Sequence, residues 1–103
     1  MTIIAILGGT GHEGSGLGLR WAKAGHQIII GSRTVEKAQT AAAELNEKLG
    51  IDTVQGMDNL AAAAAAELVV LTVPYAAHTP TIESVRDAVQ GKIFVDVTVP
   101  LVP

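Results

Sequence analysis

The protein has 103 residues, of which 49% are hydrophobic and 17% charged, enough apolar material for the core of one modest domain. Its net charge of −3, without a cluster of lysine and arginine, argues against a nucleic-acid-binding surface, and the absence of cysteine excludes disulfides and thiolate chemistry. No apolar run reaches the roughly 18 residues that a membrane-spanning helix needs, and the N-terminus lacks a signal-peptide pattern, so we expect a cytoplasmic protein.

The N-terminal segment predicts a strand, a glycine-rich loop and a helix in direct succession. Ile3–Leu7 is apolar at consecutive positions, as in a parallel strand that is covered on both faces. Gly9, Gly11 and Gly14 then give the Gly-x-Gly-x-x-Gly spacing of a dinucleotide-binding βαβ unit, and helical spacing follows Gly14. These glycines permit a tight turn, approach of the backbone to a pyrophosphate and close helix–strand packing, and a helix N-terminus attracts phosphates. The alternative is a tight turn without a ligand.

The next elements are a second buried strand and a long amphipathic helix. Gly25 ends the first helix, Gln27–Ile30 forms the strand, and Thr34 is placed to cap the second helix, which Gly50 closes. The apolar stripe of this helix recurs at steps of three and four residues and consists of Val35, Ala38, Ala42, Leu45 and Leu49.

Two more strands with an intervening helix are predicted between residues 52 and 73. Asp52–Gln55 is short and half polar, which is typical of a strand toward an edge of the sheet. Asp58 is placed to cap a short helix through the alanine run 61–66, since alanine is the best helix former. Leu68–Val73 is continuously apolar and therefore predicts a central fourth strand.

A helix over residues 80–90 and a fifth strand, Ile93–Val97, complete a regular alternation of strands and helices. This alternation predicts an α/β fold with a doubly wound parallel sheet of five strands in the order 3-2-1-4-5. In that order the first and fourth strands diverge, and ligands bind outside their carboxyl ends. The glycine loop and the Val73-Pro74 loop follow these two strands, so we expect both loops to face one site.

The end of the second strand indicates which dinucleotide binds. NAD-binding folds usually carry an acidic residue here, but this chain has Gly31-Ser32-Arg33-Thr34. Arg33 can pair with a 2′-phosphate in fork geometry, Ser32 and Thr34 can donate hydroxyl groups, and Lys37 can reach the same phosphate. The sequence therefore favours NADP over NAD. The alternative is that Arg33 is a solvated loop arginine and Thr34 only a helix cap.

Several of these segments together resemble the NADP reductases that depend on the 5-deazaflavin coenzyme F420. The resemblance covers essentially the whole chain, and its most specific part is the Gly-Ser-Arg turn joined to the Val-Pro-aromatic loop. The segments that carry it are Ile6-Leu7-Gly8-Gly9-Thr10-Gly11, Gly16-Leu17-Gly18-Leu19-Arg20, Ala24-Gly25-His26, Gly31-Ser32-Arg33, Glu36-Lys37-Ala38, Leu71-Thr72-Val73-Pro74-Tyr75 and Val99-Pro100-Leu101-Val102-Pro103.

The resemblance implies a reversible hydride transfer between the reduced deazaflavin and the nicotinamide of NADP, with the two rings stacked face to face. No covalent nucleophile, catalytic side chain or metal is expected, because the protein mainly binds and orients the two cofactors. By the motif match, the pyrophosphate would lie along Thr10, Gly11, His12 and Glu13. The 2′-phosphate would lie at Ser32, Arg33 and Lys37, and the nicotinamide beside Val73 and Pro74.

His78 is the side chain that we expect to face the nicotinamide or its amide, with an ordinary loop histidine as the alternative. His12 is expected to act through its backbone N–H, and Glu13 to turn to solvent. Tyr75 is followed four residues later by Thr79, whereas short-chain dehydrogenases need a lysine at that spacing.

Members of the resembled family are longer, and their second half helps to enclose the deazaflavin and to build the subunit interface. We therefore interpret residues 1–103 as the NADP-binding half. The alternatives are a non-catalytic NADP-binding or redox-sensing module, and a fragment of another NADP-dependent dehydrogenase, since Gly8-x-x-Gly11-x-x-Gly14 also fits extended short-chain dehydrogenases. The apolar C-terminal end of the chain suggests a homodimer.

Overall fold

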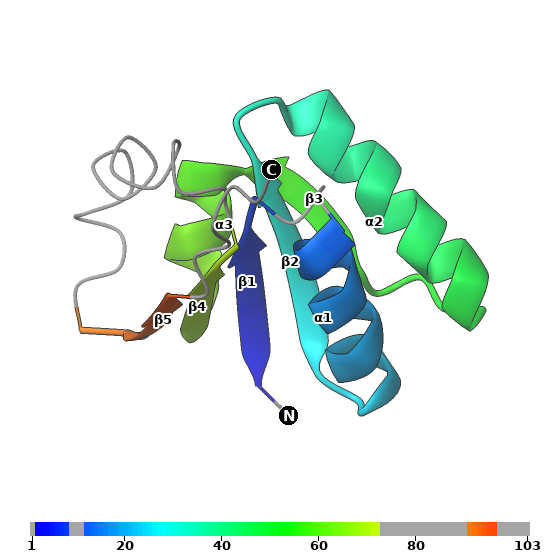
Figure 1. The fold of residues 1–103 in the computed structure, drawn as a ribbon, viewed down its shortest axis with the longest axis horizontal. Coiled ribbons are helices and arrows are strands. Elements are labelled where there is room, and N and C mark those ends of the chain that lie inside the picture. The colour runs from blue at the N-terminus through cyan, green and yellow to red at the C-terminus, as the bar shows by residue number, and fades with distance from the viewer. Residues whose placement is uncertain (1, 9–11, 73–90, 97–103) are drawn as a thin grey trace, which may run out of the picture.

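A computed structural model describes residues 2–8, 12–72 and 91–96 of the chain. The strands are β1 (Ile3–Leu7), β2 (Gln27–Ser32), β3 (Gln55–Asp58), β4 (Leu68–Leu71) and β5 (Ile93–Asp96), and the helices are α1 (His12–Lys23), α2 (Val35–Leu49) and α3 (Asn59–Ala65). All strand pairs are parallel, and the sheet order is β3-β2-β1-β4-β5 (Figure 1). The predicted doubly wound topology is confirmed.

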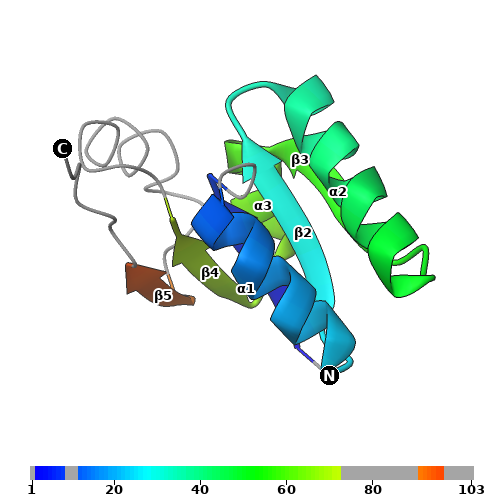
Figure 2. The same cartoon turned by 45° about the vertical axis from the view of Figure 1, so that its right-hand side comes forward.

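The core lies in two layers, one on each face of the sheet. Ile4 and Ile6 of β1 pack with the buried residues of α2, whereas Ala5 and Leu7 pack with those of α3. Figures 1 and 2 show α1 and α2 on one face and α3 on the other. Successive residues of β1 are therefore buried on opposite faces, which explains why the strand is apolar at every position.

Two glycines allow helices to approach the sheet closely. A Cβ added to Gly18 of α1 would lie 3.2 Å from Leu45 and 3.4 Å from Ile6. A Cβ on Gly56 of β3 would lie 2.3 Å from the carbonyl carbon of Ala38 in α2, a distance that no real side chain shows. Gly18 therefore lets α1 lie close to the sheet and to α2, and the sheet–helix contact at Gly56 admits only glycine.

The predicted helix ends agree with the structure. Gly25 and Gly50 follow α1 and α2 in the left-handed region, with φ of +98° and +66°, which glycine adopts without strain. Asp58 Oδ1 accepts a hydrogen bond from the backbone N–H of Ala61 at 2.8 Å and so caps α3.

The third strand lies three residues later than predicted, at Gln55–Asp58 instead of Asp52–Gln55, although it is an edge strand as expected. The side-chain amide of Asn46 explains the shift. Its Oδ1 accepts from Val54 N at 2.9 Å, and its Nδ2 donates to Val54 O at 3.0 Å. Because these bonds hold the Val54 backbone against α2, pairing with β2 begins only at Gln55.

The starts of α1 and α2 also differ from the prediction. α1 begins at His12 rather than after Gly14, so that glycine lies in the first turn of the helix. Thr34 is the N-cap of α2, but its side chain makes no capping hydrogen bond. Val35 is 42% exposed, whereas Ala38, Ala42 and Leu45 of the predicted stripe are buried. The buried stripe therefore starts at Ala38.

β4 ends at Leu71, before the predicted end at Val73, because the backbone N–H and the hydroxyl of Thr72 both donate to Leu7 O. Val73, the Pro74 loop, the helix over residues 80–90 and the C-terminal segment 97–103 lie outside the described residues. Within the described part of the chain, no helix is long and apolar enough to cross a membrane.

Candidate dinucleotide-binding site

The ends of three strands are tied together at the carboxyl edge of the sheet. Gly8 N, just after β1, donates to the carbonyl oxygen of Gly31 in β2 at 2.9 Å. Thr72, just after β4, donates to the carbonyl oxygen of Leu7 twice, through its backbone N–H at 2.9 Å and its hydroxyl at 3.0 Å. The chain segments that leave β1, β2 and β4 therefore start side by side, as the predicted ligand site requires.

The N-terminus of α1 begins shortly after β1 ends. Gly8 has a φ of +75°, a conformation suited to glycine, and the helix starts at His12. Figure 2 shows the start of α1 beside the end of β1. His12, Glu13 and Gly14 thus belong to the first turn of α1, whose backbone N–H groups have no partners within the helix and can receive an anion. The predicted loop residues Gly9, Thr10 and Gly11 lie outside the described residues.

The turn after β2 is built by Ser32. Its side chain is buried, with 8% exposure, and its Oγ accepts a hydrogen bond from Thr34 N at 3.2 Å. This local bond fixes the backbone of the turn. Arg33 and Thr34 are exposed. The turn therefore presents the guanidinium group of Arg33 and the hydroxyl group of Thr34, which makes no capping hydrogen bond, beside the first turn of α2.

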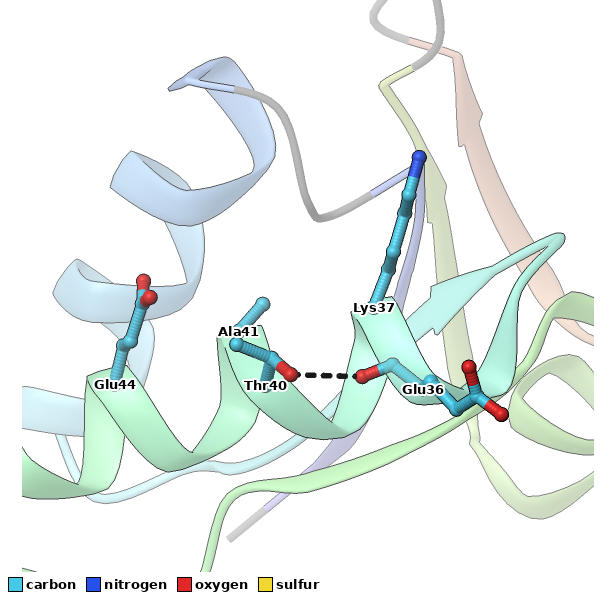
Figure 3. A pocket seen from close by; sticks show the side chains of 5 residues that line it. All are labelled: Glu36, Lys37, Thr40, Ala41 and Glu44. Carbon is cyan, nitrogen blue, oxygen red and sulfur yellow. Dashed lines mark hydrogen bonds between the residues drawn. The ribbon is translucent and has the colours of Figure 1, made fainter.

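Lys37 lies one helical turn beyond Thr34 and is exposed. It lines one end of an open groove of about 450 Å³ along α2, together with Glu36, Thr40, Ala41 and Glu44. Figure 3 shows Lys37 extended away from the helix, while the carboxylate of Glu36 points in another direction. Two carboxylates and one ammonium group make most of this groove unfavourable for an anion, so only its Lys37 end suits a phosphate.

The nearest carboxylate on a neighbouring strand belongs to Asp58, which is paired in register with Ser32. Because this acid belongs to β3, its position beside the end of β2 is not evident from the sequence of β2. Its Oδ1 accepts from Ala61 N, so the carboxylate serves the N-terminus of α3. β2 itself ends in Gly31 and Ser32 and carries no acidic residue.

Asn59 is a residue of this edge that sequence reasoning missed. It is 7% exposed, and its Oδ1 is the buried side-chain polar atom that has no hydrogen-bond partner in the described part of the chain. A Cβ on Gly31 would lie 2.9 Å from this oxygen, so Asn59 lies directly behind the strand end that leads into Ser32. A polar residue that opens an alanine helix at a strand end was the signal available in the sequence.

Other predicted site residues are not placed. Val73, Pro74 and His78 lie outside the described residues. Among the residues that the structure describes, no group of three or more His, Cys, Asp or Glu side chains could hold a metal ion.

Comparison with known proteins gives a family match and several relatives. The model of the family described as NADP oxidoreductase coenzyme F420-dependent matches residues 3–100. The F420-dependent NADP reductase of Methanothermobacter thermautotrophicus is 51% identical over 100 residues, covering 95% of this chain and 43% of the relative. That of Methanocaldococcus jannaschii is 46% identical over 102 residues, covering 95% and 45%. The chain therefore spans less than half the length of the curated relatives that it matches.

Solved structures agree with the observed fold. A crystal structure of a candidate F420-dependent NADP reductase from Arthrobacter sp. FB24 superposes with a TM-score of 0.77 at 26% identity, covering 95% of this chain and 44% of that one. Sorbitol-6-phosphate 2-dehydrogenase from Erwinia amylovora has a TM-score of 0.56 at 22% identity, covering 66% of this chain and 32% of that one. The latter likeness concerns the fold alone.

Proposed function

Because the chain belongs to the family of coenzyme F420-dependent NADP oxidoreductases, we propose that it is the NADP-binding half of such an enzyme. In the proposed reaction, the reduced deazaflavin gives a hydride to the nicotinamide ring of NADP⁺ and releases a proton, so that NADPH and oxidised deazaflavin form. The hydride chemistry belongs to the two cofactors, and the protein's part is to bind them and align their rings.

One observation supports NADP more than any other, namely the exposed cationic turn at the end of β2. Arg33 can bind a 2′-phosphate through two parallel N–H donors, and Lys37 adds a second positive charge one turn along α2. Thr34 leaves the first-turn N–H groups of α2 without a side-chain cap, so these donors suit the same phosphate. Ser32 Oγ accepts from Thr34 N, which leaves its hydroxyl hydrogen for a phosphate oxygen.

The rest of the dinucleotide is assigned by the motif match. The pyrophosphate would lie along Gly9, Thr10, Gly11 and the first turn of α1, where His12, Glu13 and Gly14 supply backbone N–H groups. We propose Val73, Pro74 and His78 for the nicotinamide end. The bonds that join the ends of β1, β2 and β4 support this arrangement, because they bring the starts of all three segments to one edge.

Calorimetric titration with NADP and NAD tests the nucleotide assignment. We expect NADP to bind at least tenfold more tightly, since a 2′-phosphate would gain charge-assisted hydrogen bonds that NAD cannot make. Equal affinity, or a preference for NAD, would contradict the proposed role of the β2 turn. Mixing the chain with reduced deazaflavin and NADP, and following NADPH absorbance, tests the hydride transfer.

A second candidate is a non-catalytic NADP-binding or redox-sensing module. It rests on the same exposed cationic turn at the end of β2, which accounts for NADP binding and by itself requires no hydride transfer. Tight NADP binding without NADPH formation would support this candidate over the enzyme. The expected homodimer and cytoplasmic location stay predictions, and sedimentation equilibrium at micromolar concentration tests the first of them.

A further inference from the structure

Asn59 carries an unpaired oxygen atom at the edge of the sheet where the proposed nucleotide site lies. The residue is 7% exposed, and its Oδ1 is buried without a hydrogen-bond partner in the described part of the chain. An unpaired buried acceptor costs free energy, and folded proteins keep few of them. Asn59 is therefore a candidate for contact with a bound molecule.

Asn46 shows how an asparagine with a purely structural role is bonded in the same chain. Its Oδ1 accepts a hydrogen bond from Val54 N at 2.9 Å, and its Nδ2 donates to Val54 O at 3.0 Å. Asn59 is not the residue that caps α3, since Asp58 Oδ1 accepts from Ala61 N at 2.8 Å. Capping thus does not account for the polar side chain at position 59, where alanine would suit the helix and leave no buried oxygen unpaired.

The amide group of Asn59 lies beside Gly31, at the end of β2. A Cβ added to Gly31 would lie 2.9 Å from Asn59 Oδ1, so glycine leaves room for this oxygen. Gly31 directly precedes Ser32, and its carbonyl oxygen accepts from Gly8 N, just after β1. β2 and β3 are parallel and end at the same edge of the sheet (Figure 1). Asn59 therefore lies next to the strand end that leads into the proposed phosphate-binding turn.

The proposed function puts the adenosine ribose of NADP near this point. The ribose joins the 2′-phosphate, assigned to the turn after β2, to the pyrophosphate, assigned to the segment after β1. NAD-binding folds carry an acidic residue at the end of β2 as the acceptor for ribose hydroxyl groups, whereas β2 ends here in Gly31 and Ser32. In NADP the 3′-hydroxyl is still a donor. An amide oxygen can accept from it without the repulsion that a carboxylate would exert on the 2′-phosphate.

We propose that Asn59 Oδ1 accepts a hydrogen bond from the 3′-hydroxyl group of the adenosine ribose of NADP. The amide group meets this hydroxyl by turning about its Cβ–Cγ bond, a torsion with a broad and roughly two-fold energy profile. Nucleotide binding then removes the cost of the unpaired oxygen that the free protein carries. The inference rests on the proposed NADP binding and adds to it a neutral ribose acceptor that belongs to α3 instead of β2.

The test titrates two small nucleotides into three forms of the 103-residue chain by calorimetry. Adenosine 2′,5′-bisphosphate contains the adenosine, the 2′-phosphate and one 5′-phosphate of NADP, and its 3′-deoxy derivative lacks only the 3′-hydroxyl. The three proteins are the wild type, Asn59→Leu and the matched control Asn46→Leu. Leucine is close to asparagine in shape but offers no acceptor. The Tm of each protein without nucleotide is measured alongside.

We expect the wild type to bind adenosine 2′,5′-bisphosphate roughly five- to tenfold more tightly than the 3′-deoxy derivative. Asn59→Leu should bind both compounds equally and with the weaker affinity, because the acceptor is gone. Its Tm should not fall, since the substitution removes an unpaired buried oxygen. Asn46→Leu should instead lower the Tm by roughly 5–10 °C and keep the preference for the 3′-hydroxyl. If Asn59→Leu does not fold, Asn59→Ala extends the alanine helix and serves the same comparison.

Three results would overturn the proposal while leaving NADP binding in place. A preference for the 3′-hydroxyl that persists in Asn59→Leu would assign this hydroxyl to another acceptor. A fall in Tm as large as that of Asn46→Leu would mean that Asn59 Oδ1 is paired within the protein. If the loss in Asn59→Leu disappears with inosine 2′,5′-bisphosphate, the oxygen pairs with the 6-amino group of adenine. Failure of the proposed function is recognised separately, because the wild type would then bind 5′-AMP as tightly as adenosine 2′,5′-bisphosphate.

Discussion

Arg33 is the residue on which the choice between NADP and NAD depends. It is exposed on a turn whose backbone is fixed by the hydrogen bond from Thr34 N to Ser32 Oγ. The point at which the Arg33 side chain leaves the backbone is therefore fixed as well. We predict that Arg33→Ala weakens NADP binding by about 1.5–3 kcal/mol and NAD binding by less than about 0.5 kcal/mol. Calorimetric titration of both nucleotides measures the difference.

Arg20→Ala is the matched control for this prediction. Arg20 is also exposed, but it lies in the last turn of α1, toward the opposite edge of the sheet. Its removal should leave both affinities unchanged. An equal loss of NADP and NAD binding in Arg33→Ala would show that the arginine does not recognise the 2′-phosphate.

Two glycines should respond to alanine with opposite signs. Gly56→Ala would place a Cβ 2.3 Å from the backbone of Ala38, so α2 and β3 would have to separate. We predict a loss of about 3 kcal/mol or more in the free energy of unfolding. Gly16 in α1 has no atom within 4 Å of such a Cβ, and Gly16→Ala should raise stability by about 0.5–1 kcal/mol.

Urea unfolding of both glycine variants measures these changes as shifts of the midpoint at constant slope. A Gly56→Ala protein with unchanged stability would mean that the contact between β3 and α2 is looser than the structure shows. The comparison also separates steric cost from the general effect of replacing glycine.

At the scale of elements, Lys92 links the start of β5 to the end of α3. Its Nζ donates to the carbonyl oxygens of Ala63 and Ala64 at 2.6 and 2.7 Å, in the last turn of the helix. These carbonyls have no partner within the helix, and a cation at this end also interacts favourably with the helix dipole. Lys92→Met keeps the aliphatic stem and should lower the free energy of unfolding by about 1 kcal/mol.

Lys23→Met is the control for the lysine prediction, since Lys23 is exposed in the last turn of α1. It should change stability by less than about 0.5 kcal/mol. Thermal unfolding of the two variants distinguishes the outcomes, and equal effects would mean that the two Lys92 hydrogen bonds contribute nothing beyond a surface charge.

The elements that could be predicted from sequence are those whose signal is local. The alternation of strands and helices predicted the strand order, the continuous apolar runs of β1 and β4 predicted buried strands, and the glycines after α1 and α2 predicted the helix ends. β3 was placed three residues too early, because its start is set by bonds between Asn46 and Val54 and by the contact of Gly56 with Ala38. These are tertiary contacts that no pattern within the strand records.

At the scale of the whole molecule, the sequence likewise predicts some residues of the candidate site and not others. Ser32 and Arg33 follow from the motif at the end of β2, because the topology brings that end beside β1. The sequence marks Asn59 as the polar residue that opens α3, but its position beside Gly31 depends on how α3 packs on the sheet. The sequence thus predicts which strand ends form the carboxyl edge of the sheet, but not the side-chain contacts between different elements at that edge.

Nucleotide binding should stabilise the whole domain, because the proposed site joins segments from β1, β2 and β4. A ligand that binds only the folded state adds about 2.7 kcal/mol at a hundredfold excess over its Kd. For a domain of this size, that corresponds to a rise of roughly 10–20 °C in Tm. We predict this rise with NADP and a much smaller one with NAD at the same concentration, measured by differential scanning calorimetry. In Arg33→Ala the NADP shift should move toward the NAD value, because the variant retains the pyrophosphate contacts and loses the guanidinium contacts with the 2′-phosphate. If the rise in Tm with NADP is unchanged in Arg33→Ala, residues other than this arginine recognise the 2′-phosphate.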